Sequence, residues 1–238
     1  MDLDLNTLRF NGCDSLEDFF VGVQSYPDIP TTNENYETYN VEGKSGSLIV
    51  NKGTYNDKTI PFELVLLKTD NFHQRFDSIN SWLDNINDNR LIYDRVDKCY
   101  RVKKVIKDNI KRQAYYGEGE FKISFLCEPF LTDIEKTKFN ITNNNFVFYY
   151  LGTQEAPLNL KVFGAGDVSI TLNNNTMRVS NVSDYITIDS ELKQIRDNEN
   201  ESKDLESIGN YFYVTPGKNI LSFENVSKIE AEYLALYK

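Results

Sequence analysis

Few residues in this sequence of 238 residues could carry out catalysis. His73 is its one histidine, so a Ser-His-Asp or Cys-His mechanism would have to use it as the base. It follows a predicted helix cap at Thr69-Asp70, where a surface position is expected. A zinc site takes several His or Cys ligands, and the sequence has no second histidine and no Cys-x-x-Cys pair. We therefore predict neither a catalytic histidine nor a metal site.

Two acidic pairs and two glycine segments are the remaining candidates for chemistry. The acidic pairs resemble ordinary surface and do not single out a catalytic site; they are Glu118 with Glu120 and Asp184 with Asp189. The glycine segments at 43–46 (GKSG) and 164–166 (GAG) lack the spacing of phosphate-binding loops. We interpret these glycines as tight turns. The sequence thus predicts a protein that is not an enzyme and has no cofactor.

The cysteines and the first ten residues indicate the compartment. The cysteines form an odd, sparse set, which is typical of reduced, buried thiols and not of a disulfide framework: Cys13, Cys99 and Cys127. Residues 1–10 are acidic and alternate in polarity, unlike a signal peptide. No apolar run is long enough to span a bilayer. We expect synthesis in a cytoplasm, without export by a signal peptide and without a membrane partner.

The most informative charge feature is a basic segment from residue 95 to residue 112. The whole chain carries a net charge of −10, which argues against nucleic acid as a partner. Within the segment only Asp97 and Asp108 oppose the basic residues, which are Arg95, Lys98, Arg101, Lys103, Lys104, Lys107, Lys111 and Arg112. One interpretation is a solvated hairpin. The other is a basic arm that docks on an acidic neighbour, including another copy of the chain.

The elements that would position these residues are mostly strands, with one helix. Tyr and Phe are abundant, and they favour pleated, half-buried surfaces. The helix is predicted from an apolar stripe at steps of four, three, four and three, with Trp82 beside it: Phe72, Phe76, Ile79, Leu83 and Ile86. An amphipathic helix of about four to five turns should pack on a sheet.

Strand signals change in character near residue 130. Before it we predict strands at 3–10, 19–26, 47–51 and 59–67, a polar loop before residue 43, and long strands between Leu91 and Pro129 that turn at 109–112. Proline should end that run, because it cannot donate to a ladder. After it, short strands at even spacing predict a sandwich, with a solvated loop at 196–206. The predicted domains are therefore 1–135 and 136–238.

The order of several segments resembles the siphophage distal tail protein family. In the first half these segments are PDIP at 27–30, VEGKSGSL at 41–48, GTYNDKTI at 53–60, INSWL at 79–83 and GEFKISFLCEPF at 119–130. In the second half they are APLNLKVFGAG at 156–166, YITIDSE at 185–191 and YVTPGKNI at 213–220. The resemblance covers nearly the whole chain and rests on structural motifs, not on a catalytic signature.

The resemblance implies a mainly β fold. Its first part would be an N-terminal β-sandwich or split barrel with one packed helix and a long hairpin, and its second a galectin-like sandwich. It also implies a structural protein of the virion tail, made in the bacterial host. The first domain would form a ring, usually a hexamer, that continues the tail tube. The second would anchor baseplate parts, so the implied partners are the tail tube protein, a tail-tip protein and a receptor-binding protein. The alternative is a carbohydrate-binding module that uses the C-terminal sandwich.

Overall fold

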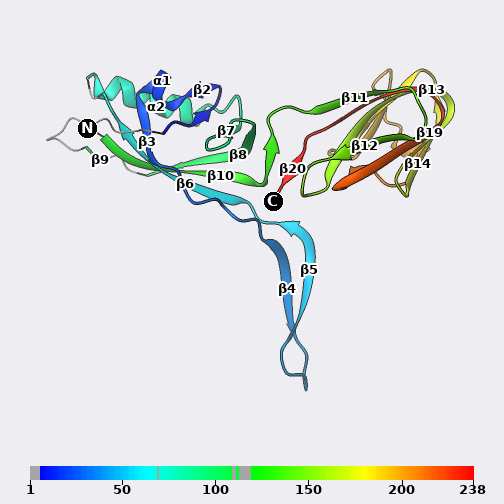
Figure 1. The fold of residues 1–238 in the computed structure, drawn as a ribbon, viewed down its shortest axis with the longest axis horizontal. Coiled ribbons are helices and arrows are strands. Elements are labelled where there is room, and N and C mark those ends of the chain that lie inside the picture. Colours follow the sequence, from blue (N-terminus) through cyan, green and yellow to red (C-terminus); the bar gives the residue numbers. More distant parts are fainter. Residues whose placement is uncertain (1–5, 69, 109–110, 113–118) are drawn as a thin grey trace. The chain divides into compact units, whose positions relative to one another are not determined.

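The computed structural model describes residues 6–68, 70–108, 111–112 and 119–238, with the backbone alone for Lys111 and Arg112. These residues form two compact units, 1–134 together with residue 238, and 135–237 (Figure 1). Both units consist mainly of strands, so the predicted mainly β class is confirmed. We refer to them as unit 1 and unit 2.

Unit 1 is built on one antiparallel sheet in the order β2-β1-β7-β8-β10-β6-β3. Its strands are β1 (Arg9–Phe10), β2 (Cys13–Asp14), β3 (Val21–Ser25), β6 (Lys58–Leu66), β7 (Arg90–Ile92), β8 (Lys98–Lys107) and β10 (Gly119–Asp133), with β9 (Lys111–Arg112) paired to β10. Asn6, just before β1, forms an antiparallel bridge with Val23 on β3. The sheet therefore curls until its two ends meet, and one face encloses an apolar core.

The predicted helix is α2 (Phe72–Asp84), which packs on this sheet with Ile79, Trp82 and Leu83 buried. The Trp82 indole N–H donates a hydrogen bond of 2.8 Å to the Phe10 carbonyl. The predicted cap is wrong in position. The N-cap is Asn71, which has a left-handed backbone and makes no side-chain cap bond, whereas Thr69 lies outside the described residues. The Asp70 carboxylate instead accepts a hydrogen bond from Arg75.

A second, short helix was not predicted. It is α1 (Ser15–Phe19), and the Asp14 carboxylate caps it by accepting hydrogen bonds from the backbone N–H groups of Leu16 and Glu17. Five residues are too few to show a helical apolar period, so only the cap could have revealed it. Asn11 and Gly12 form the turn between β1 and β2, since both residues have positive φ and the flanking Phe10 and Cys13 pair.

The long strands predicted between Leu91 and Pro129 are neighbours, because β8 pairs antiparallel with β10. The predicted end at Pro129 is wrong, since β10 continues to Asp133. The pairing register shifts between Cys127 and Leu131, so Pro129 lies in an irregular stretch of the ladder that needs no N–H donor. The turn predicted at 109–112 falls partly outside the described residues, as do Glu118 and the strand predicted at residues 3–5.

The stretch before residue 43, predicted as a polar loop, is a strand. It is β4 (Glu34–Asn40), and it pairs antiparallel with β5 (Ser47–Tyr55). The two strands make a sheet of their own, and they pair with no other described strand (Figure 1). We call residues 34–55 the hairpin arm.

Unit 2 is a sandwich of two sheets that share two long strands, β13 (Ala156–Leu172) and β19 (Gly217–Tyr233). Each has 17 residues and is longer than the short strands predicted for this half of the chain. One half of each strand lies in the sheet β11-β19-β13-β15-β16, which we call the β15 sheet. The other halves lie in the sheet β12-β19-β13-β14-β17, the β14 sheet.

The remaining elements of unit 2 are short. They are β11 (Thr137–Ile141), β12 (Phe146–Tyr150), β14 (Asn175–Val182), β15 (Tyr185–Asp189), β16 (Gln194–Asp197), the 3-10 helix η1 (Asp204–Glu206), β17 (Ser207–Ile208), β18 (Tyr213–Val214) and β20 (Leu236–Tyr237). Part of the loop predicted at 196–206 is therefore ordered in β16 and η1. Apolar side chains from both sheets fill the space between them, among them Val162 and Ile229 of the β15 sheet and Ile170 of the β14 sheet, each fully buried.

Candidate interaction surfaces

The residues considered for catalysis lie apart in the structure. His73 is exposed on α2, whereas Asp184 and Asp189 stand at opposite ends of β15. Across the described part of the chain, no three His, Cys, Asp or Glu side chains are grouped as metal ligands. None of the described helices is long and apolar enough to cross a membrane.

The three cysteines are free thiols. Cys99 and Cys127 are buried, and Cys13 is half-buried. Burial raises the pKa of the Cys127 thiol to about 12, so this group is protonated at neutral pH and is a poor nucleophile. Its cross-strand neighbour Lys58 is also buried, which the sequence did not predict, and burial lowers the pKa of that ammonium.

Most of the basic segment lies in strand β8 of the unit 1 sheet. Several of its side chains contact polar groups of the same chain. Lys103 donates to Asp57 at 2.7 Å, and Lys107 to Asp84 at 2.7 Å. Arg95 pairs with Asp97, Arg101 donates to Asn89, and Lys98 contacts both Asp97 and Asp133. Lys104 is exposed and contacts no carboxylate among the described residues. The side chains of Lys111 and Arg112 lie outside the described residues.

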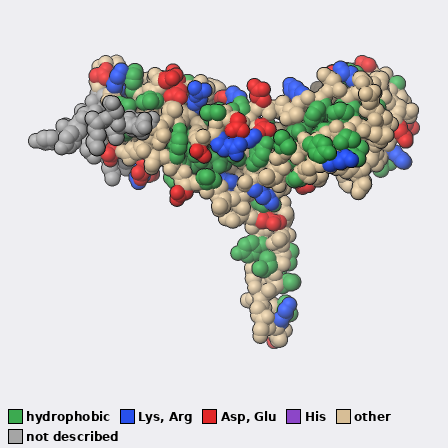
Figure 2. All heavy atoms as spheres, in the orientation of Figure 1, with side chains coloured by type: hydrophobic (Ala, Val, Ile, Leu, Met, Phe, Trp, Pro, Cys, Tyr) green, Lys and Arg blue, Asp and Glu red, His purple; other side chains and the backbone are tan. Residues whose placement is uncertain are grey.

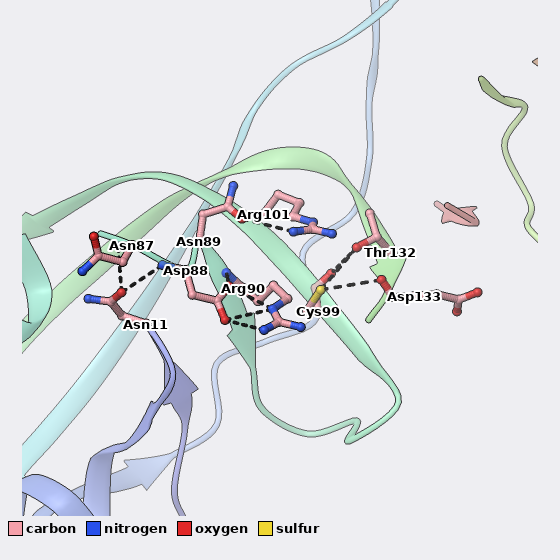
Figure 3. A network of polar contacts seen from close by, with 9 residues as sticks. All are labelled: Asn11, Asn87, Asp88, Asn89, Arg90, Cys99, Arg101, Thr132 and Asp133. Atoms are coloured by element: carbon pink, nitrogen blue, oxygen red, sulfur yellow. Dashed lines mark hydrogen bonds and ion pairs between the residues drawn. The ribbon is translucent and has the colours of Figure 1, made fainter. Parts of the chain in front are cut away.

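Part of this segment belongs to a polar network at one end of β7 and β8 (Figure 3). Asp88 accepts three hydrogen bonds from the Arg90 guanidinium. These bonds hold the pKa of the Asp88 carboxyl below its usual value. Cys99 lies next to Thr132 and the Asp133 carbonyl on β10. The network fixes the start of β8 against its neighbours, so its role is structural.

Asn11 holds this network to α2. Its side-chain amide N–H groups donate to the carbonyls of Trp82 and Asn85, and its oxygen accepts from the backbone of Asn87 and Asp88. Its φ of 53° lies in the left-handed region. We expect Asn11→Ala to lower the free energy of unfolding by about 2 kcal/mol, from the lost hydrogen bonds and the backbone strain.

Urea unfolding measures this loss, and Asn11→Gly is the matched control. Glycine accepts a positive φ, so this variant loses the hydrogen bonds alone and should be less destabilised than the alanine variant. An Asn11→Ala protein as stable as the wild type would contradict the structural role of this side chain.

The hairpin arm has an unusual surface for a two-stranded ribbon. Figure 2 shows apolar side chains exposed on the arm. The large ones are Tyr36 (62% exposed), Tyr39 (50%), Leu48 (48%), Ile49 (61%) and Val50 (45%), and the alternation of side chains along β5 places Ile49 on the opposite face from Leu48 and Val50. Register places Thr38 opposite Ile49, and Tyr39 opposite Leu48. At its base, the Tyr55 ring packs against Phe130 with centroids 5.0 Å apart. An isolated hairpin is marginally stable at best in water, and exposed apolar patches usually mark interaction sites.

The comparisons with known proteins agree with this architecture. Residues 14–127, all in unit 1, match the model of the phage tail protein RIFT-related domain. The chain is similar to the Dit protein of phage SPP1, solved as a paradigm of the hub adsorption apparatus in phages that infect Gram-positive bacteria. The TM-score is 0.73 at 12% identity, over 97% of this chain and 99% of that chain. No curated protein gives a significant match.

Two structures of the phage P2 baseplate in its activated conformation, one with Ca and one with Sr, also match. Their TM-scores are 0.45 and 0.46 at 11% identity, and the matches cover 97% of both chains.

Unit 1 thus contains a match to a phage tail domain, and the predicted location in the virion tail is confirmed. Over nearly its full length, the fold of the chain is similar to that of SPP1 Dit. The resemblance to siphophage distal tail proteins that the motifs predicted is therefore confirmed.

Proposed function

We propose that this protein forms a ring at the distal end of the tail and joins the tail tube to the baseplate and receptor-binding components. Residues 1–135 would form the ring, and the galectin-like domain at 136–238 would hold the peripheral parts. The proposed partners are further copies of the chain, in a hexamer, together with a tail tube protein, a tail-tip protein and a receptor-binding protein.

The observation that carries the proposal is the hairpin arm. Its large apolar side chains keep between 45% and 62% of their surface exposed in the single chain, so burying the rest requires another surface. Strand β5 has nine residues and reaches roughly 30 Å, far enough to lie across a neighbouring subunit. In a closed ring each copy offers the same surface to the arm of the copy before it, and every arm is then buried.

The basic residues of β8 are proposed as a second part of the same interface. The contacts within the chain leave Lys104 as the exposed charge without a carboxylate partner among the described residues. An acidic surface on the next subunit would pair with it. The other members of the set would contribute less, because Arg101, Lys103 and Lys107 already have polar partners in their own chain.

Lys104→Glu is therefore expected to weaken assembly by roughly tenfold at an ionic strength of about 0.05 M, with a smaller effect at about 0.5 M. Sedimentation velocity over a concentration series measures this change. Lys218→Glu is the control, since Lys218 is an exposed lysine on the β14 sheet of unit 2. If the two variants assemble equally, the result would contradict the proposal that β8 is part of the subunit interface.

Position in the particle is tested by immunogold labelling of intact virions with antibodies against this chain. The proposal predicts gold at the distal end of the tail, between the tube and the receptor-binding parts. Gold along the whole tube, or at the junction of head and tail, would contradict it.

A further inference from the structure

The outer face of the β15 sheet is hollowed into a groove of about 530 Å³ in unit 2. Side chains from all five strands line it. Register places one polar row across its middle: Asn140, Glu230, Lys161, Thr187 and Arg196. The last four are half-buried. Because neighbouring strands lie about 4.8 Å apart, Lys161 on β13 and Arg196 on β16 stand roughly 10 Å apart with Thr187 between them.

The carboxylates of the groove already have partners. Glu230 accepts a hydrogen bond of 2.6 Å from Lys228, and Glu232 accepts one of 2.6 Å from Lys136. Asp189 accepts the backbone N–H groups of Glu191 and Leu192 at 3.0 and 2.9 Å. The negative charges of these three carboxylates are thus stabilised by hydrogen bonds from groups of the same chain.

Two cations in the groove have no such partner. The Lys161 ammonium lies over the Tyr185 ring, 4.0 Å from its centre. The Arg196 guanidinium donates only to neutral oxygens, the Gln194 side chain and the Asn200 carbonyl. Among the described residues, neither cation reaches a carboxylate within ion-pair distance. Arg196 is held in a fixed orientation, which favours recognition of a planar or tetrahedral anion.

Charge is segregated around this groove. Residues 135–237 contain nine basic and fourteen acidic side chains. The groove has three carboxylates. Five of the basic residues line the groove or pair with these carboxylates: Lys136, Lys138, Lys161, Arg196 and Lys228. The lining itself has three basic and three acidic side chains, and the lysines that pair with Glu230 and Glu232 leave Lys161 and Arg196 as cations that can attract an anionic ligand.

The form of the groove favours a saccharide over a peptide. Its central strands β19, β13 and β15 are paired on both sides, so they offer no free edge for peptide backbone. Among its lining residues only Leu192 is a large exposed apolar side chain, so the groove lacks the apolar anchors of a protein interface. It offers the tips of polar side chains, which match hydroxyl groups.

We propose that this groove binds an anionic saccharide. Lys161 and Arg196 hold the carboxylate or phosphate group of the sugar, and Asn140 and Thr187 bind its hydroxyls. The proposal is independent of ring formation, because the groove lies wholly within unit 2.

The test is isothermal titration of the full-length protein with four probes. These are tetragalacturonate, a phosphorylated mannopentaose, uncharged maltotetraose and inorganic phosphate. At least one anionic sugar should bind, maltotetraose should bind more weakly, and Lys161→Gln with Arg196→Gln should weaken the anionic sugar by at least about tenfold. The two anionic sugars distinguish carboxylate from phosphate. Lys218→Gln, which removes one positive charge from the β14 sheet where the groove variant removes two from the β15 sheet, should bind as the wild type does.

Four results would overturn the proposal. The first is that neither anionic sugar binds, and the second is equal binding by the groove variant and the Lys218→Gln control. The third is tighter binding of an oligoglutamate peptide than of either sugar, which would assign the groove to a protein partner. Phosphate binding as tight as the sugar would reduce the site to an anion site and also contradict the proposal. Unchanged thermal unfolding of the groove variant verifies that it remains folded.

Discussion

A double variant of the hairpin arm, Ile49→Asp with Val50→Asp, is expected to fold normally and to lose assembly. These two side chains point to opposite faces of the arm and are 61% and 45% exposed. Because they are exposed, their replacement should change the stability of the single chain by less than about 0.5 kcal/mol. In a ring both would be buried in contacts between subunits, where an uncompensated carboxylate costs several kcal/mol. Light scattering coupled to gel filtration should therefore show single chains.

The matched control carries the same substitutions on other exposed apolar residues. Leu205 and Ile208 of unit 2 are 103% and 80% exposed. Leu205→Asp with Ile208→Asp adds the same charge and should leave the oligomer intact. If the arm variant assembles as the control does, the arm is not part of the subunit interface.

The largest expected effect on folding comes from Phe125→Ala. Phe125 is fully buried on β10, and its ring lies 5.0 Å from that of Phe10 and 5.6 Å from that of Phe62. Its truncation removes apolar contacts and leaves a cavity among large side chains. We expect the free energy of unfolding of unit 1 to fall by about 3–5 kcal/mol.

Trp82 is the only tryptophan and is buried beside Phe10, so its fluorescence in urea reports the unfolding of unit 1. Phe125→Leu keeps most of the apolar volume and should cost less than about 1.5 kcal/mol. A loss below about 1 kcal/mol for Phe125→Ala would mean that this core closes around the missing ring, contrary to the packing described.

The helix could be predicted from sequence because its period is long and regular. Phe72, Phe76, Ile79 and Leu83 recur at helical spacing along a helix of thirteen residues, which no strand would do. The predicted position of its cap was wrong, because Asn71 precedes the helix in a left-handed backbone conformation and makes no side-chain cap hydrogen bond. Similarly, β13 and β19 each carry polar or glycine residues at an irregular point of their pairing, and these residues resembled turns.

The arm and the groove could not be predicted from the sequence, and the reason is a different one. The sequence of β4, ENYETYN, is polar and resembles a loop, because neither of its faces contacts the core of its own chain. The groove depends on which residues of β13, β15 and β16 lie side by side, and cross-strand register is not contained in any single segment. The basic segment was visible as composition, but its partners Asp57 and Asp84 are distant in sequence.

The most direct test of the ring is native mass spectrometry of the purified full-length protein over a range of concentrations, with negative-stain images of the same sample. Self-assembly through the hairpin arm predicts a closed particle of about six subunits of 27.6 kDa each, and images of rings with a central opening. A single 27.6 kDa species at every concentration, or open filaments in place of rings, would contradict it.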